Sequence, residues 1–145
     1  MASFNKFNNF VDGLAKGIVL NTDTLKVMLT NTAPVATNTQ YSDISGNELA
    51  NGNGYTTGGS TIASTSATNT TGTESIAGTA VTFTATAAMG PFRYAVIYDN
   101  TPATKWLIGW FDYGSSITLN QYETFSVSSA IAGNWNTANP ILTIA

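Results

Sequence analysis

The sequence contains neither cysteine nor histidine. Without cysteine the chain has no disulfide framework and no thiolate chemistry. Without histidine it lacks the commonest general base and metal ligand. An ordinary zinc site and a histidine- or cysteine-based catalytic triad are therefore excluded. None of the eight acidic residues lies in the alternating Asp/Asn loop that wraps calcium. We expect a protein that is not an enzyme and that needs no cofactor.

Charge is also scarce. Charged residues make up 9% of the chain, against roughly 25% in an average soluble domain. The net charge is −3 and the five basic residues are scattered, whereas nucleic-acid binding needs clustered positive charge. No run of about 18 apolar residues, the length that a membrane-spanning helix needs, is present. We therefore expect no nucleic-acid partner and no membrane span. A surface of hydroxyls and amides loses little desolvation energy when it is covered, which favours a protein that works inside an assembly over a soluble monomer.

Apolar residues at the N-terminus recur with helical spacing. Phe4, Phe7, Val11 and Leu14 are separated by three, four and three residues, with Phe10 beside them. This spacing predicts a helix over residues 3–16. We predict residues 1–17 to be an N-terminal helical segment that precedes a single β domain at residues 18–145. The Phe-rich face of the helix would dock either on its own domain or on a neighbour.

Beyond Thr24 the apolar pattern changes to period two. The stretches "TLKVMLTN", "TAVTFTATA" and "FRYAVIYD" alternate as strands do, and "KWLIGWFDY" is apolar on both faces. The stretches "SSITL", "YETFSVSSAI" and "PILTIA" add three more strands. About seven or eight strands with one helix predict an all-β fold, an antiparallel β-sandwich or jelly roll. We expect residues 42–79, rich in Gly, Asn, Ser and Thr, to form a long surface excursion with one or two weak strands near residues 59–66. Within it, residues 46–60 and 67–74 would be loosely held.

Seven of the sixteen aromatic residues of the sequence fall within residues 90–116. They are Phe92, Tyr94, Tyr98, Trp106, Trp110, Phe111 and Tyr113. On a regular strand Trp106 and Trp110 would point to the same face, roughly 13 Å apart. That arrangement suits either a buried core or an exposed platform that stacks sugar rings. The apolar neighbours Leu107 and Phe111 favour the core.

Two acidic residues are candidates for a catalytic pair. Asp99 and Asp112 could serve a glycosidase if their carboxyl groups met in space. Asp99 lies in "YDNTP", however, where an Asp side chain most simply holds a turn. The glycine-rich stretch "GNGYTTGG" lacks the lysine of a P-loop and the spacing of a dinucleotide fingerprint. We predict no catalytic, cofactor-binding or metal-binding residues.

Four stretches of the chain carry a family resemblance. They are "LKVMLTNTAPVATNTQYSDI", "GNGYTTGG", "GPFRYAVIYDNT" and "LIGWFDYGSSITLNQYETFSV". From Leu25 onward the chain resembles small structural proteins of tailed bacteriophages. The resemblance implies a head decoration, or cement, protein with a β-sandwich fold that binds the major capsid protein. It implies a place on the capsid surface of the virion after synthesis in the host cytoplasm. A tail or receptor-binding component that binds glycans is the alternative, and no catalytic residues carry over.

The predicted N-terminal helix leaves an apolar face without an obvious partner, because the second half of the chain already supplies a core. Such a face invites association, and identical chains usually associate with closed symmetry. We therefore expect a homo-oligomer, with a trimer preferred over a dimer. Its interface would involve the helix and loops at one end of the β domain. The predicted interface residues are Phe4, Phe7, Phe10, Val11, Leu14 and Tyr55.

Overall fold

The computed structural model describes residues 2–128 and 140–144. These residues form a mostly β structure with antiparallel sheets, which confirms the all-β prediction. Among the described residues there is one α-helix, α1 (Phe10–Lys16), and two short 3-10 helices, η1 (Tyr41–Asp43) and η2 (Ser45–Asn47). No helix in these ranges is long and apolar enough to cross a membrane.

The largest sheet has five strands in the order β1-β8-β7-β2-β3. The strands are β1 (Ser3–Lys6), β2 (Leu25–Thr30), β3 (Ser60–Thr61), β7 (Met89–Asp99) and β8 (Leu107–Leu119). β7 and β8 form a long hairpin and β2 pairs along the other side of β7. The stretches "KWLIGWFDY" and "SSITL", predicted as two strands, form the single strand β8, which continues through Gly114. This sheet is the scaffold to which the other elements attach.

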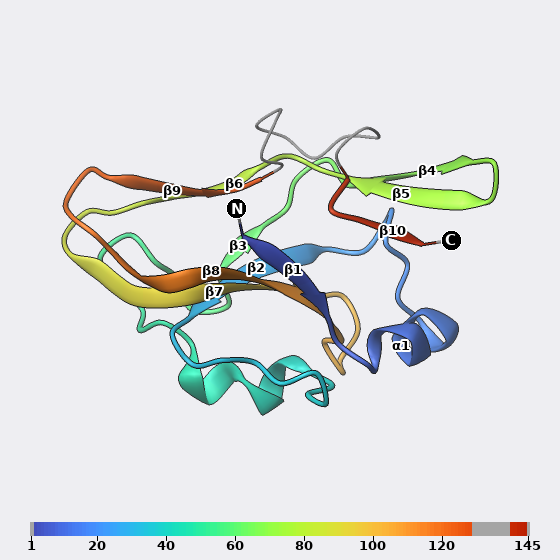
Figure 1. Cartoon of the computed structure of the whole chain (residues 1–145), viewed down its shortest axis with the longest axis horizontal. Helices are drawn as coiled ribbons and strands as arrows, with labels where there is room; N and C mark the ends of the chain where they lie inside the picture. The colour runs from blue at the N-terminus through green and yellow to red at the C-terminus, as the bar shows by residue number, and fades with distance from the viewer. Residues whose placement is uncertain (1, 129–139, 145) are drawn as a thin grey trace.

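Two smaller sheets lie over one face of the five-stranded sheet (Figure 1). One has the order β10-β5-β4, with β4 (Ser66–Thr70), β5 (Thr73–Ala77) and β10 (Leu142–Ile144); the other pairs β6 (Val81–Thr84) with β9 (Thr124–Val127). Large apolar side chains from both layers meet between them, and they include Val27, Leu29, Ile97, Ile76 and Phe83. Burying each contributes about 1.5–3 kcal/mol, so this layer of side chains is the main core.

The opposite face of the five-stranded sheet is covered by residues 31–47, a loop that contains η1 and η2 (Figure 1). A second apolar cluster lies beneath this loop. It consists of Phe7, Met28, Ile44, Tyr94, Val96, Tyr98, Leu107 and Trp110. Because both faces of the sheet are covered, Met28 is as fully buried as Val27 and Leu29. The alternation in "TLKVMLTN" predicts a strand with one buried face, and this prediction was wrong.

The N-terminal helix is shorter than predicted. Residues 3–6 form β1, which pairs with β8, and only residues 10–16 are helical. Phe4 packs on Phe111 with 5.2 Å between ring centroids, while Phe7 packs on Trp110 at 4.5 Å. The separation of three residues places Phe4 and Phe7 on opposite faces of an extended chain, so the helical spacing was a coincidence. The N-terminal segment thereby contributes an edge strand to the sheet of the β domain.

Candidate functional site

The structure divides the six predicted interface residues into two groups. Phe7, Phe10 and Tyr55 are 0%, 3% and 2% exposed and belong to the apolar clusters of this chain. Their prediction as interface residues is corrected, because side chains that fill the protein's own core are not available to a partner. Leu14 is half-buried against the main core. Phe4 and Val11 are 38% and 57% exposed and are the two that a partner could reach.

Large exposed apolar side chains concentrate near the N-terminus. Among the described residues they are Phe4, Val11, Val19, Val35 and Tyr122. Three of these five, Phe4, Val11 and Val19, lie in or next to β1 and α1. We call these three residues the α1-end surface. An ion pair between Lys16 and Asp12 (2.8 Å) lies on the exposed side of the same helix. Sequence reasoning missed Val19 because it follows the helix and lies outside the helical repeat.

The aromatic side chains of residues 90–116 mostly fill the two clusters. Trp110 is 9% exposed and packs in the second cluster, as predicted, whereas Trp106 is half-buried against the main core. The two tryptophans therefore do not share a face. The reason is a bulge: Ile97 pairs with Gly109 but Tyr98 pairs with Leu107, so β8 has one extra residue here. A row of two exposed tryptophans for sugar stacking is not formed.

A partly buried hydrogen-bond cluster centres on Glu48. Its carboxylate accepts hydrogen bonds from the Tyr55 hydroxyl (2.5 Å), the Gly58 backbone N–H (2.7 Å) and the Tyr41 hydroxyl. The Tyr55 hydroxyl in turn accepts a bond from the Leu29 N–H (3.1 Å). Sequence reasoning missed this cluster. The available signal was that Glu48 is the only charged residue in the sequence between Asp43 and Glu74 and stands seven residues from each tyrosine.

The Glu48 cluster is structural. Burial, and then the hydrogen bond to Glu48, raises the pKa of Tyr55 and of Tyr41 far above the ordinary value of a phenol. Both hydroxyls therefore stay protonated as donors and offer no base or nucleophile. The Tyr98 hydroxyl also donates to the Gly58 carbonyl (2.8 Å). These bonds tie residues 48–58 to β2 and β7, so the prediction that residues 46–60 are loosely held was wrong.

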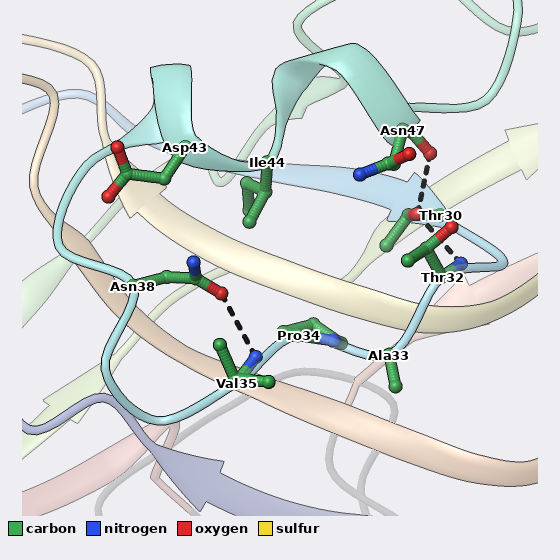
Figure 2. A pocket seen from close by; sticks show the side chains of 9 residues that line it. All are labelled: Thr30, Thr32, Ala33, Pro34, Val35, Asn38, Asp43, Ile44 and Asn47. Carbon is green, nitrogen blue, oxygen red and sulfur yellow. Dashed lines mark hydrogen bonds between the residues drawn. The ribbon is translucent and has the colours of Figure 1, made fainter.

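A pocket of about 160 Å³ lies between the 31–39 loop and the two 3-10 helices (Figure 2). It is lined by Thr30, Thr32, Ala33, Pro34, Val35, Asn38, Asp43, Ile44 and Asn47. Much of its polar lining already bonds within the chain. Asn38 Oδ1 accepts from Val35 N (2.9 Å), Thr30 Oγ1 donates to the Asn47 carbonyl (2.6 Å), and Asp43 accepts from Thr39 and Gln40. The hydrogen bonds from Thr39 and Gln40 lower the pKa of Asp43. The pocket therefore offers few unpaired groups to a sugar.

The carboxyl groups of Asp99 and Asp112, the candidate glycosidase pair, do not meet. Asp112 lies opposite Tyr94 and Asp99 lies opposite Leu25, which separates them by roughly 16 Å along β7. Glycosidase carboxyl groups lie roughly 5–10 Å apart. Asp112 instead receives two bonds from Arg93, at 2.7 and 3.0 Å, which hold the pKa of its carboxyl below the usual range. Within residues 2–128 and 140–144, no group of three or more acidic side chains is placed to hold a metal ion.

Comparison with known proteins identifies no relative of this chain. No protein-family model matches the sequence, and no curated protein and no solved structure is significantly similar to it.

Proposed function

We propose that this protein is a structural component of a bacteriophage particle that binds the assembled head and stabilises the capsid lattice without catalysing a reaction. The proposal is supported by the resemblance of the chain from Leu25 onward to small phage structural proteins and by its sparsely charged surface. The two layers of antiparallel sheet accord with a β-sandwich or jelly roll, the finer fold that we propose.

The observation that carries the proposal is the α1-end surface. Val11, Val19 and Phe4 are 57%, 48% and 38% exposed, whereas the apolar side chains of the two core clusters are buried. Exposed large apolar side chains that recur within one short segment of the chain are candidates for an interaction site. We propose the major capsid protein as the partner, with sister copies completing a homo-oligomer, preferably a trimer, on the capsid surface of the virion.

Stabilisation of a shell by such a protein follows from mass action. A protein that binds the assembled shell and not the free subunit shifts the equilibrium toward the shell. The contact of each copy can be weak, because an oligomer that engages several subunits at once gains from effective concentration. A sparsely charged surface suits this role, since few charges have to be desolvated when it is covered.

The experiment uses surface variants of the full chain. Removing residues 1–16 would also remove Phe7 and Phe10 from the core, so a truncation would confuse binding with folding. The Val11→Asp/Val19→Asp variant places charge on the α1-end surface. Tyr122→Asp is the matched control: Tyr122 is 79% exposed in the β8–β9 turn, at the other end of the molecule from α1 (Figure 1).

Each protein is mixed with assembled heads that lack it, and binding is measured by co-sedimentation. We expect saturable binding of the wild-type protein and of Tyr122→Asp, and at least a tenfold loss of affinity for the Val11→Asp/Val19→Asp variant. Equal binding of all three would show that the α1-end surface is not the contact. If the wild-type protein ignores heads and binds host cells, the protein is a receptor-binding component instead.

A further inference from the structure

The side chain of Asp99, at the end of β7, is completely buried. Its Oδ1 accepts a hydrogen bond from the Thr101 backbone N–H (2.9 Å). Its Oδ2 has no hydrogen-bond partner among the described residues. A buried carboxylate with one bare oxygen is costly, so the group requires something that neutralises it or satisfies that oxygen.

A second carboxyl group lies beside it. Asp23 belongs to the turn between α1 and β2, and its side chain lies within hydrogen-bonding reach of Asp99. Asp23 Oδ2 accepts a bond from the Val19 N–H (2.7 Å). Two ionised carboxylates can only accept, so they cannot bond to one another. With one proton between them, one carboxyl becomes a donor and Asp99 Oδ2 gains its missing bond.

None of the five basic side chains neutralises the pair. Lys16 binds Asp12 and Arg93 binds Asp112. Lys105 lies over the Tyr41 ring, 5.4 Å from its centroid, and Lys26 lies beside Gly58, while Lys6 is exposed on β1. Among the residues that the structure describes, Asp23 is the one charged group that raises the pKa of Asp99. A metal ion would need a third acidic ligand or open coordination space, and the described residues offer no group of three such ligands.

We propose that Asp99 and Asp23 share one proton, so that the Asp99 carboxyl donates a hydrogen bond to the Asp23 carboxylate. This hydrogen bond holds the α1–β2 turn against the end of β7. The proton stays bound to the pair and no other group is transferred. Two further bonds close the same contact: Thr24 N–H to Thr101 Oγ1 (2.7 Å) and Asn100 N–H to the Thr24 carbonyl (2.8 Å). The proposal does not depend on the proposed function.

The hydrogen bond between Asp99 and Asp23 is expected to be lost as pH rises. Burial, followed by the neighbouring Asp23 carboxyl, raises the pKa of Asp99 to about 7, from 3.8. Because the folded state holds this proton more tightly than the unfolded state, the stabilisation is complete below pH 4 and is lost as pH rises from about 4 to 7. Above pH 7 two negative charges face one another next to Val19. The α1–β2 turn, which carries part of the α1-end surface, should then open more often.

The test compares the pH dependence of stability in the wild-type protein and in Asp99→Asn. The amide of asparagine can donate to Asp23 at any pH, so it replaces the shared proton. The urea midpoint of the wild-type protein should fall between pH 5 and pH 8.5, and amide exchange at Val19 and Asp23 should accelerate at least tenfold more than in the variant. The fall should shrink to less than a third in Asp99→Asn and persist in the control Asp12→Asn.

A second measurement keeps the proposal open to refutation if Asp99→Asn fails to fold. Carbon-detected NMR of the wild-type protein should show one aspartate carboxyl that titrates near pH 7. If every aspartate carboxyl titrates below pH 5, or if the Asp99→Asn midpoint falls as far as that of the wild-type protein, the pair does not share a proton. Stabilisation at pH 8.5 by calcium or magnesium that EDTA reverses would show that a metal ion, and not a proton, joins the two groups.

Discussion

Tyr55→Phe removes one buried oxygen atom and leaves the ring in place. That oxygen accepts a bond from Leu29 N–H at 3.1 Å and donates one to Glu48 at 2.5 Å. Losing it leaves a buried backbone donor without this partner and deletes a bond to a charged group, each of which costs about 1–3 kcal/mol. We expect the free energy of unfolding to fall by about 2–4 kcal/mol, with the ring contact to Phe83 (5.7 Å between centroids) retained.

Urea denaturation followed by tryptophan fluorescence measures the effect. With a slope of about 2 kcal/mol/M, the midpoint should fall by roughly 1–2 M with an unchanged slope. Tyr122→Phe is the matched control because Tyr122 is 79% exposed, and it should change stability by less than about 0.5 kcal/mol. A double-mutant cycle of Tyr55→Phe with Glu48→Gln should give a coupling energy of at least about 1 kcal/mol. If Tyr55→Phe unfolds at the same urea concentration as Tyr122→Phe, the Glu48 cluster does not hold the loop.

Three further predictions concern stability. Gly59→Ala should destabilise the protein by more than about 2 kcal/mol, because Gly59 has a φ of +70° and a Cβ there would lie 1.8 Å from the Val27 carbonyl oxygen. Gly46→Ala is the control and should be tolerated, since a Cβ at Gly46 would have nothing within 4 Å. Equal urea midpoints for the two variants would contradict this. Trp110→Ala should cost roughly 3–5 kcal/mol in the same assay, and a variant as stable as the wild-type protein would show that the second cluster is not a core. Burial raises the pKa of both Tyr98 and Tyr113 to about 12. The contribution of these two phenols to the free energy of unfolding is therefore complete below pH 10 and should be lost as pH rises toward 12. A circular dichroism signal that is constant up to pH 12 would refute this prediction.

Local periodicity was sufficient for the strands whose side chains alternate between buried and exposed positions, or are apolar on both faces. In "TAVTFTATA" the predicted alternation is confirmed, because Val81 and Phe83 are buried and Thr82 and Thr84 are exposed in β6. β2, β7 and β8 were also found from their apolar pattern. The predicted strand "YETFSVSSAI" is confirmed as β9 over residues 124–127, and its last residues, 129–131, lie outside the described residues.

Periodicity failed where a distant partner decides the conformation. Residues 3–6 form an edge strand because they pair with β8, from Ser3 opposite Asp112 to Lys6 opposite Gly109. Nothing local in the sequence encodes that pairing. The bulge in β8 that separates the two tryptophans is likewise set by its pairing with β7.

The candidate site was predicted only in part, for a related reason. The hydrophobicity of Phe7, Phe10 and Tyr55 was clear from the sequence, but whether they face a partner or their own core depends on tertiary packing. The contact between Asp23 and Asp99 joins residues 76 positions apart, beyond the reach of any local pattern.

The central claim, that the protein decorates the phage head, is tested most directly by its position on purified particles that carry it. Cryo-electron microscopy of such particles, with an antibody fragment against the protein as a marker, gives both its location and its copy number. We predict uniform copies over the capsid surface, with α1 directed at the major capsid protein. A few copies confined to the tail tip, or no copies on the particle, would contradict the account.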